Sequence, residues 1–413
     1  MRQTRLGPNS RESCKGIDME FAGLTVVPHC APVRDLRSGT LAAVDVQLRG
    51  EEGGPLATSA ALRTVARSIS EQVQLDALTA SVADHLEAQS VPLMVSVDVG
   101  SLSELRADSG AADKHEVVII TDHALITDPS NVLHLIATAR AEGKVIAVDD
   151  VGKVGRSLAL LPLIEPEVVI LAAELLSRRP DSHVSRVAHA IAAHAELTGA
   201  AVIAHGVDSD EQLERALALG ADYGVGEHFP SLEPLATLFE ERCVPIPFGT
   251  APVREGRLPF DIAAEGRRIH RSRKRLLVEM STTLERHAEV AGPDTILLGT
   301  FQHAHNFTSG TRDRWESIAA RVAYAGVYGV GMGPFVDGNV HHAPLDPAEP
   351  LVDEWNVVVL APHFCAVLSA KDIHRGDHDA DREFDYVVSY ERSTAVRCAR
   401  AILDRFAEAP GNS

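Results

Sequence analysis

Residues 145–152 read VIAVDDVG and place two adjacent carboxylates, Asp149 and Asp150, directly after an apolar run. The run is short and rich in β-branched residues, which favours a buried strand. Two carboxylates at the end of such a strand repel each other unless cations neutralise them. The pair therefore predicts a metal or phosphate-ester site. A simpler interpretation stays open, in which Asp150 caps the following helix and Asp149 is solvated.

On both sides of this segment, residues 20–242 alternate short apolar runs with helical stretches, and Gly143, Gly199 and Gly220 mark helix ends. Repeated strand–helix units predict a parallel sheet, and their number favours a (β/α) barrel. In that fold the chemistry takes place where the strands end and the loops begin. We expect strands at 24–28, 42–48, 92–97, 116–121, 145–148, 168–171 and 201–204, and helices near 59–89, 129–142, 182–198 and 210–219.

The composition excludes several classes of protein. The chain of 413 residues carries 39 Lys and Arg against 58 Asp and Glu, a net charge of −19. Charge of this sign repels phosphate backbones and anionic lipid, so we expect neither nucleic-acid binding nor a membrane role. The most apolar stretch, 158–176, is interrupted by charged residues, and the polar N-terminus has no signal-peptide core. Five scattered cysteines form no CxxC motif, so we expect a cytoplasmic protein with reduced thiols.

Seven segments of residues 20–242, taken in order, resemble the motifs of the EAL family, bacterial (β/α)8-barrel proteins that hydrolyse cyclic di-GMP with two divalent metal ions. DVQLR at 45–49 stands for EALxR, VSVDVGS at 95–101 for VNLS, IITD at 119–122 for ExTE and DDVG at 149–152 for DDFG. VILA at 169–172 stands for LKID, AHGVD at 204–208 for AEGVE and DYGVG at 222–226 for DYxQG. The resemblance implies an EAL-type (β/α)8 barrel.

The same resemblance implies that catalytic groups are missing. The positions at which the family holds its metals correspond here to Asp45, Asp98, Ile119 and Asp149, and an isoleucine cannot bind a metal. Ile170 stands where the family has a lysine that helps to activate water. His205 stands where the family has a glutamate, a candidate general base. Each loss should slow hydrolysis by orders of magnitude. The resemblance thus implies a catalytically degenerate barrel that needs no cofactor.

The polar residues of the expected barrel mouth would form a vestigial pocket. Arg49 stands at a position that contacts phosphate in the family, whereas Gln47 replaces a leucine that packs on a guanine. The pocket comprises Asp45, Arg49, Asp98, Asp122, Asp149, Asp150, His205 and Asp208. In a rearranged, active site the metal ligands would be Asp45, Asp98, Asp149 and Asp150, with Mg²⁺ or Mn²⁺ as the cofactor.

The remaining sequence predicts a second, smaller α/β domain. Residues 1–19 are expected to be a disordered tail, 20–242 the barrel, 243–263 a proline-containing linker and 264–408 the second domain. The segments 300–332, 351–372 and 381–393 resemble the DICT sensory domain of bacterial signalling proteins. We interpret the basic run 267–275 as the solvated face of a helix that begins near Arg267.

These observations lead to one hypothesis and two alternatives. We expect a bacterial signalling protein whose degenerate EAL barrel binds a protein partner, a second copy of itself or a residual nucleotide such as cyclic di-GMP. The C-terminal sensor would control that binding. The first alternative is an active, metal-dependent cyclic di-GMP phosphodiesterase with a rearranged site. The second is a sensor centred on the DICT-like domain, for which the barrel is only a scaffold.

Overall fold

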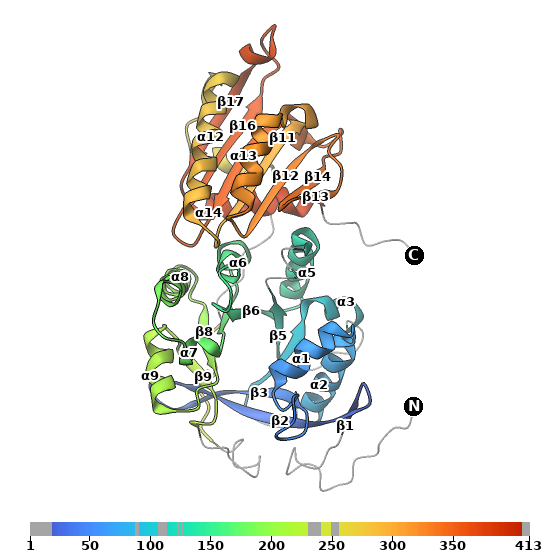
Figure 1. The fold of residues 1–413 in the computed structure, drawn as a ribbon, viewed down its shortest axis with the longest axis vertical. Coiled ribbons are helices and arrows are strands. Elements are labelled where there is room, and N and C mark those ends of the chain that lie inside the picture. Colours follow the sequence, from blue (N-terminus) through green and yellow to red (C-terminus); the bar gives the residue numbers. More distant parts are fainter. Residues whose placement is uncertain are drawn as a thin grey trace. The chain divides into compact units, whose positions relative to one another are not determined.

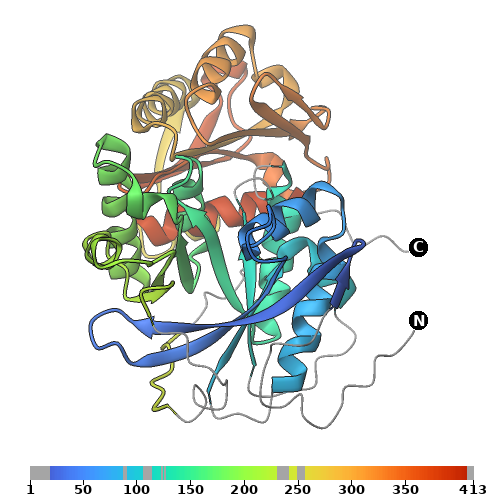
Figure 2. The same ribbon diagram turned by 60° about the horizontal axis from the view of Figure 1, so that its bottom comes forward.

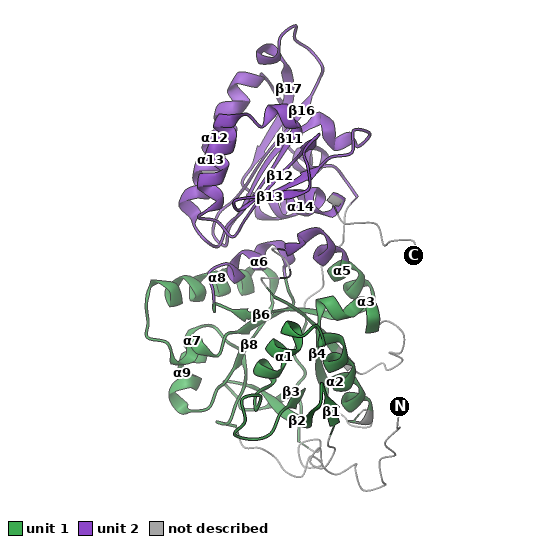
Figure 3. Cartoon of the chain, turned by 45° about the vertical axis from the view of Figure 1, so that its right-hand side comes forward, with its two compact units in different colours: residues 1–121, 135–153, 166–251 green, residues 122–134, 154–165, 252–413 purple. Residues whose placement is uncertain are grey.

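The structure is a computed structural model that describes residues 19–86, 91–105, 114–121, 124, 127–229, 241–248 and 256–406. The chain divides into two compact units, which Figure 3 shows in different colours. Unit 1 comprises residues 1–121, 135–153 and 166–251, and unit 2 comprises residues 122–134, 154–165 and 252–413. Two short segments of the barrel sequence therefore belong to unit 2.

Unit 1 contains a closed barrel of strands β2 to β9, with β1 paired to the free side of β2 (Figure 1; Figure 2). β2 runs antiparallel to both of its barrel neighbours, β3 and β9, and the other neighbouring strands run parallel. The predicted (β/α)8 barrel is confirmed. Its strands are β1 (Met19–Phe21), β2 (Leu24–Asp35), β3 (Leu41–Arg49), β4 (Leu93–Asp98), β5 (Lys114–Ile120), β6 (Val145–Val151), β7 (Val168–Leu171), β8 (Ala201–His205) and β9 (Tyr223–Val225).

Small and branched apolar side chains fill the barrel interior, which is therefore packed rather than hollow. They come from every second residue of each strand, because successive side chains of a strand point to opposite faces. The interior cluster includes Ala31, Val33, Ala43, Met94, Val117, Val145, Ala147, Val168, Ile170, Ala201 and Ile203. The same alternation, continued along each strand, assigns Asp45, Asp98, Ile119, Asp149 and His205 to the inward face.

The helices of unit 1 follow the predicted positions with one exception. The single helix expected over 59–89 is wrong: it is split into α1 (Ser59–Ser68) and α2 (Gln72–Leu86), because Ser70 adopts a left-handed φ of +60°. Thr58 caps α1 through the N–H of Ala61. The other helices are α3 (Leu102–Leu105), α5 (Pro129–Ala141), α7 (Glu174–Ser177), α8 (Ser182–Thr198) and α9 (Asp210–Ala218). No helix in the described part of the chain is long and apolar enough to cross a bilayer.

Unit 2 is built on a mixed sheet with the strand order β10-β17-β16-β15-β11-β12-β14-β13. Helices α12 and α13 cover one face, with Leu277, Leu284 and Trp315 in the core, while α11 and α14 pack together on the other. The strands are β10 (His270–Arg273), β11 (Ile296–His303), β12 (Tyr324–Val330), β13 (Phe335–Asp337), β14 (Val340–Pro344), β15 (Glu354–Leu360), β16 (Cys365–Asp372) and β17 (Glu383–Ser389). The helices are α11 (Pro259–Ala264), α12 (Lys274–Ala291), α13 (Ser309–Ala319) and α14 (Arg392–Leu403).

The interpretation of the basic run 267–275 as a helix face is wrong. Residues His270–Arg273 form the edge strand β10, antiparallel to β17, and α12 begins only at Lys274. Its cations pair with acids of the same unit: Arg271 with Asp385, and Lys274 with Asp379. These ion pairs supply part of the acidic partner that the run was expected to attract.

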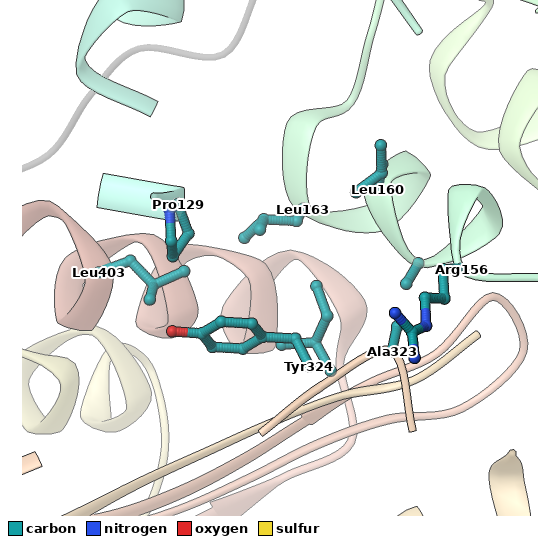
Figure 4. Close-up of a pocket in the computed structure, with 9 residues that line it drawn as sticks. Pro129, Arg156, Leu160, Leu163, Ala323, Tyr324 and Leu403 are labelled. Atoms are coloured by element: carbon teal, nitrogen blue, oxygen red, sulfur yellow. The ribbon is translucent and has the colours of Figure 1, made fainter. Parts of the chain in front are cut away.

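The segment after the paired carboxylates belongs to unit 2. There, α6 (Ser157–Ile164) packs against α14 and β15, and all eight of its residues are buried. Arg400 Nε donates to the carbonyl of Leu163 at 2.8 Å, and Arg400 Nη2 donates to Glu165 Oε2 at 3.1 Å. Figure 4 shows the small, mainly apolar cavity left in this packing, about 10 Å³, with Tyr324 and Leu163 among its walls. That volume holds about one water molecule.

Candidate functional site

The carboxyl ends of the barrel strands bring the predicted site residues to one end of unit 1. Their positions follow from strand register. In the ladder between β4 and β5, Asp98 pairs with Ile119, and Ile119 pairs in turn with Ala147 of β6. Ile119 is 3% exposed and presents only hydrocarbon at this place. The carboxylate of Asp98 therefore has an apolar neighbour on the next strand.

Three inward-facing residues of β3 form a hydrogen-bonded row. Gln47 Nε2 donates to Asp45 Oδ2 at 2.5 Å, and Arg49 Nη2 donates to Gln47 Oε1 at 3.1 Å. Burial lowers the pKa of Arg49, while the charges of Asp45, Glu227 and Asp208 act in the opposite direction. The structure thus brings Asp45, Arg49 and Asp208 into one electrostatic group. Glu227, which the sequence analysis missed, belongs to it because the closing strand β9 ends two residues earlier.

Both oxygens of the Asp98 carboxylate are engaged by the protein. Oδ1 accepts a hydrogen bond from the N–H of Gly100 at 3.0 Å, which caps a short 3-10 turn. Oδ2 accepts from Arg67 Nε at 2.9 Å. Asp98 is thus held as a cap and as an ion-pair partner of α1. A metal at this position would compete with Arg67 for the same oxygen.

A buried acid behind Asp98 was missed by the sequence analysis. Asp76 on α2 is 0% exposed and accepts hydrogen bonds from Arg63 Nη1 at 3.1 Å, Ser101 Oγ at 2.7 Å and the N–H of Asp98 at 2.9 Å. Burial raises the pKa of Asp76, and the Arg63 guanidinium acts to lower it. The signal was an isolated aspartate within an otherwise apolar helical stretch. This network fixes the end of β4 from outside the barrel.

The two carboxylates of the opening motif lie on a β-bulge. Val148 pairs with Val169 and Val151 pairs with Leu171, so Asp149 and Asp150 together stand opposite Ile170. Asp150 has a left-handed φ of +54°, and its exposed carboxylate pairs with Lys153 Nζ at 3.0 Å. The bulge thereby separates the two acids and sends Asp150 outwards.

Asp149 remains at the inner side of the bulge. Its Oδ1 accepts a hydrogen bond from the N–H of Asp150 at 2.7 Å. Burial raises the pKa of Asp149, whereas the nearby His205 lowers it. The interpretation that Asp150 caps the following helix is wrong, because α6 follows Arg156 and has no side-chain cap. Asp149 is likewise not a freely solvated acid.

The site residues thus fall into separate groups. Asp45, Arg49 and Asp208 interact on one side, Asp149 and His205 interact on another, and Asp98 and Asp150 are engaged by cations of the chain. Asp122 lies outside the described residues. Among the residues that the structure describes, no three His, Cys, Asp or Glu side chains form a group that could hold a metal ion.

Comparisons with known proteins match both units. The sequence model of the EAL domain matches residues 19–231, and that of the DICT domain, a sensory domain in diguanylate cyclases and two-component systems, matches residues 262–372. The uncharacterised EAL-domain protein YkuI of Bacillus subtilis is 29% identical over 116 residues, which is 28% of this chain and 28% of YkuI. The chain therefore matches little more than a quarter of that curated relative.

Solved structures of EAL proteins are also similar. The Xanthomonas citri FimX EAL domain in complex with c-di-GMP is 18% identical, with 49% of this chain and 86% of that chain covered and a TM-score of 0.40. Klebsiella pneumoniae BlrP1, in a complex with calcium and c-di-GMP, is 18% identical, with 49% and 54% covered and a TM-score of 0.39. Because the EAL model alone matches more than half of the residues, this chain, in which a DICT sensory domain follows the barrel, belongs to the EAL family.

Proposed function

We propose that this chain is a bacterial signalling protein whose EAL barrel acts by binding rather than by hydrolysing cyclic di-GMP, and that the DICT domain controls this binding. Ile119 carries the proposal. It is the register partner of Asp98, at a position where, by the family resemblance, a metal-holding carboxylate would stand. Hydrolysis by two metal ions needs oxygen ligands on both sides of the pair, and a buried isoleucine supplies none.

The surroundings of the other carboxylates support the same proposal. Asp98 already satisfies Arg67 and the Gly100 N–H, and Asp150 points outwards to Lys153. The residues present therefore do not fit a pair of divalent ions, and no catalytic step is derived through such a pair. Ile170, opposite the bulge, offers no amine to help activate water.

The ligand of the barrel follows from the groups that remain. Arg49 sits partly buried among Asp45, Asp208 and Glu227, so a phosphate there would meet one cation and three acids. That balance disfavours a dianionic nucleotide. We therefore place a protein partner or a second copy of the chain ahead of residual cyclic di-GMP as the bound species.

An active phosphodiesterase is the second candidate, and one observation favours it. Asp149 and His205 interact at the barrel mouth, and burial keeps the pKa of Asp149 raised. A carboxyl group with a raised pKa beside an imidazole is an arrangement typical of general acid–base pairs.

Calorimetric titration of cyclic di-GMP into the purified chain, with and without magnesium, calcium or manganese, separates the forms of binding. Micromolar binding without turnover assigns the nucleotide as the ligand of the barrel. Absence of heat under every metal condition assigns the binding role to a protein partner. Turnover with added magnesium or manganese contradicts the proposal.

A further inference from the structure

The DICT domain contains a cavity of about 80 Å³ between α12, α13 and the strands β11 and β15. All of its lining residues belong to unit 2, so the cavity exists whatever the barrel does. A single buried water needs about 10–15 Å³ by a comparable measure, so the space is several times larger than one water requires. Figure 1 shows α12 and α13 lying over the sheet at this place.

Two buried polar groups line this cavity without a hydrogen-bond partner in the described part of the chain. They are the hydroxyl of Ser281, a residue 3% exposed, and the indole N–H of Trp355. Buried donors and acceptors are nearly always paired in folded proteins, because an unpaired one loses its bonds to water without replacement. Two of them facing one space indicate a bound molecule that supplies the partners.

The charges around the cavity are already balanced within the protein. Glu285, which is buried, accepts a hydrogen bond from Arg314 Nε. Lys274 Nζ reaches both oxygens of Asp379 at 2.6 Å. A charged ligand would have to break one of these pairs or remain uncompensated in a largely apolar space. The occupant is therefore neutral.

The apolar wall is aromatic and held in place. Phe301 makes edge-to-face contacts with Phe307 and Trp315, at ring-centroid distances of 5.0 and 5.5 Å. Trp355 is braced in the same way by Phe384, at 6.0 Å. Fixed aromatic rings favour a flat ring as the occupant, because stacking gains contact area with little loss of side-chain freedom.

The backbone beside Phe301 is strained at the cavity. Gln302, which also lines it, has a left-handed φ of +59°, and the ladder between β11 and β12 shifts register between Thr300 and His303. Strained positions for residues other than glycine cluster at ligand sites. Here the strain coincides with the two unpaired groups and the aromatic wall.

We infer that this cavity is the ligand site of the sensory domain, and that its ligand is a neutral one-ring heteroaromatic molecule with a carbonyl or ring-nitrogen acceptor. The acceptor takes the N–H of Trp355, a second polar atom meets the hydroxyl of Ser281, and the ring stacks between the aromatic side chains. This inference deepens the proposed function by naming what the sensor recognises, and it rests only on unit 2.

The test uses the full-length chain and two probes of equal shape, neutral nicotinamide and anionic nicotinate. The sequence contains only two tryptophans, so an ¹⁵N-edited spectrum shows two indole N–H signals, and a Trp355→Phe variant assigns them. We expect nicotinamide at millimolar concentration to shift the Trp355 signal saturably, and nicotinate to shift it at least tenfold less strongly at the same concentration. The Trp315 signal, from the core, should stay in place and shows that each variant is folded.

Ser281→Leu fills the cavity and should abolish the nicotinamide shift. Thr283→Leu, an exposed change of the same size on the same helix, should leave it intact. The inference is overturned if nicotinamide gives no saturable shift, if nicotinate binds equally well, or if both variants behave alike. None of these outcomes depends on cyclic di-GMP, so failure here is distinguishable from failure of the proposed barrel function.

Discussion

Asp98 and Ile119 are paired residues on adjacent parallel strands of the barrel, so a carboxylate and a hydrocarbon side chain stand next to each other at the mouth. On the neighbouring helix side, Arg67 takes the Asp98 oxygen that is turned away from Gly100. The mouth is therefore stabilised by ion pairs within the chain rather than left as a cluster of acids awaiting cations. Several measurable consequences follow from this arrangement.

Divalent metals should not stabilise the protein. In a site built for two metals, saturating Mn²⁺ adds free energy of unfolding, about 2.7 kcal/mol for one site at a hundred times its Kd. We expect the same thermal midpoint for EDTA-treated protein with or without millimolar Mg²⁺ or Mn²⁺. A metal-dependent rise of several degrees, lost in Asp149→Asn, would instead favour the rearranged phosphodiesterase.

Asp76→Ala should strongly destabilise unit 1. It leaves Arg63 buried without its carboxylate and removes acceptors from Ser101 and from the Asp98 N–H. Loss of one partner of a buried ion pair typically costs about 3–5 kcal/mol. Chemical denaturation measures the change, and Glu214→Ala on the exposed side of α9 is the control, with less than about 0.5 kcal/mol expected. Equal effects of the two variants would show that the Asp76 network does not hold β4.

Gly226→Ala should destabilise the closure of the barrel. A Cβ at Gly226 would overlap the backbone of Val207, which cannot move aside as a flexible side chain could. We expect a loss of about 1–3 kcal/mol or more. Gly310→Ala is the contrasting variant, because a Cβ there meets open space, and its stability should be unchanged or higher by up to about 1 kcal/mol. A neutral Gly226→Ala would mean that β9 closes the barrel more loosely than the structure has it.

The stability of unit 2 should depend on pH through Glu354. Its carboxyl group is 0% exposed, and burial raises its pKa to about 7 although it accepts hydrogen bonds from the Phe260 N–H and from Asn356. Between pH 4.5 and 7 the unfolded chain has lost this proton while the folded chain keeps it. The free energy of unfolding therefore falls with rising pH, by about 3 kcal/mol over this range, and stays level above it.

Glu354→Gln keeps the shape and removes the titration. Urea denaturation of both proteins at a series of pH values gives the difference between them. We expect the wild type to lose stability relative to the variant as the pH rises from 4.5 to 7. Parallel curves across this range would show that Glu354 has an ordinary pKa in the folded state.

The sequence was sufficient to predict the barrel because its strands are short, apolar and separated by helices that end at glycines. It did not predict where a serine takes a left-handed φ, so α1 and α2 were read as one helix. The edge strand β10 was missed for a related reason. Its charged residues carry no apolar alternation, and only the pairing with β17 makes them a strand.

The candidate site was predictable as a set of positions but not as a set of contacts. Strand alternation correctly assigns the inward acids, since register follows from periodicity. The partners that occupy those acids come from α1 and α2, distant in sequence from β4, and nothing in the spacing links Arg67 to Asp98 or Arg63 to Asp76. The outward turn of Asp150 depends on a bulge, which an Asp-Asp pair does not announce.

Incubation of the purified chain with cyclic di-GMP and Mg²⁺ or Mn²⁺, followed by chromatography for the linear dinucleotide, tests most directly whether this barrel binds or hydrolyses. An active EAL phosphodiesterase serves as the positive control, and Asp149→Asn identifies any contaminating activity. We predict no turnover above that of the Asp149→Asn variant under either metal. Turnover at an ordinary enzymatic rate that disappears in Asp149→Asn would contradict the account and establish the chain as a phosphodiesterase.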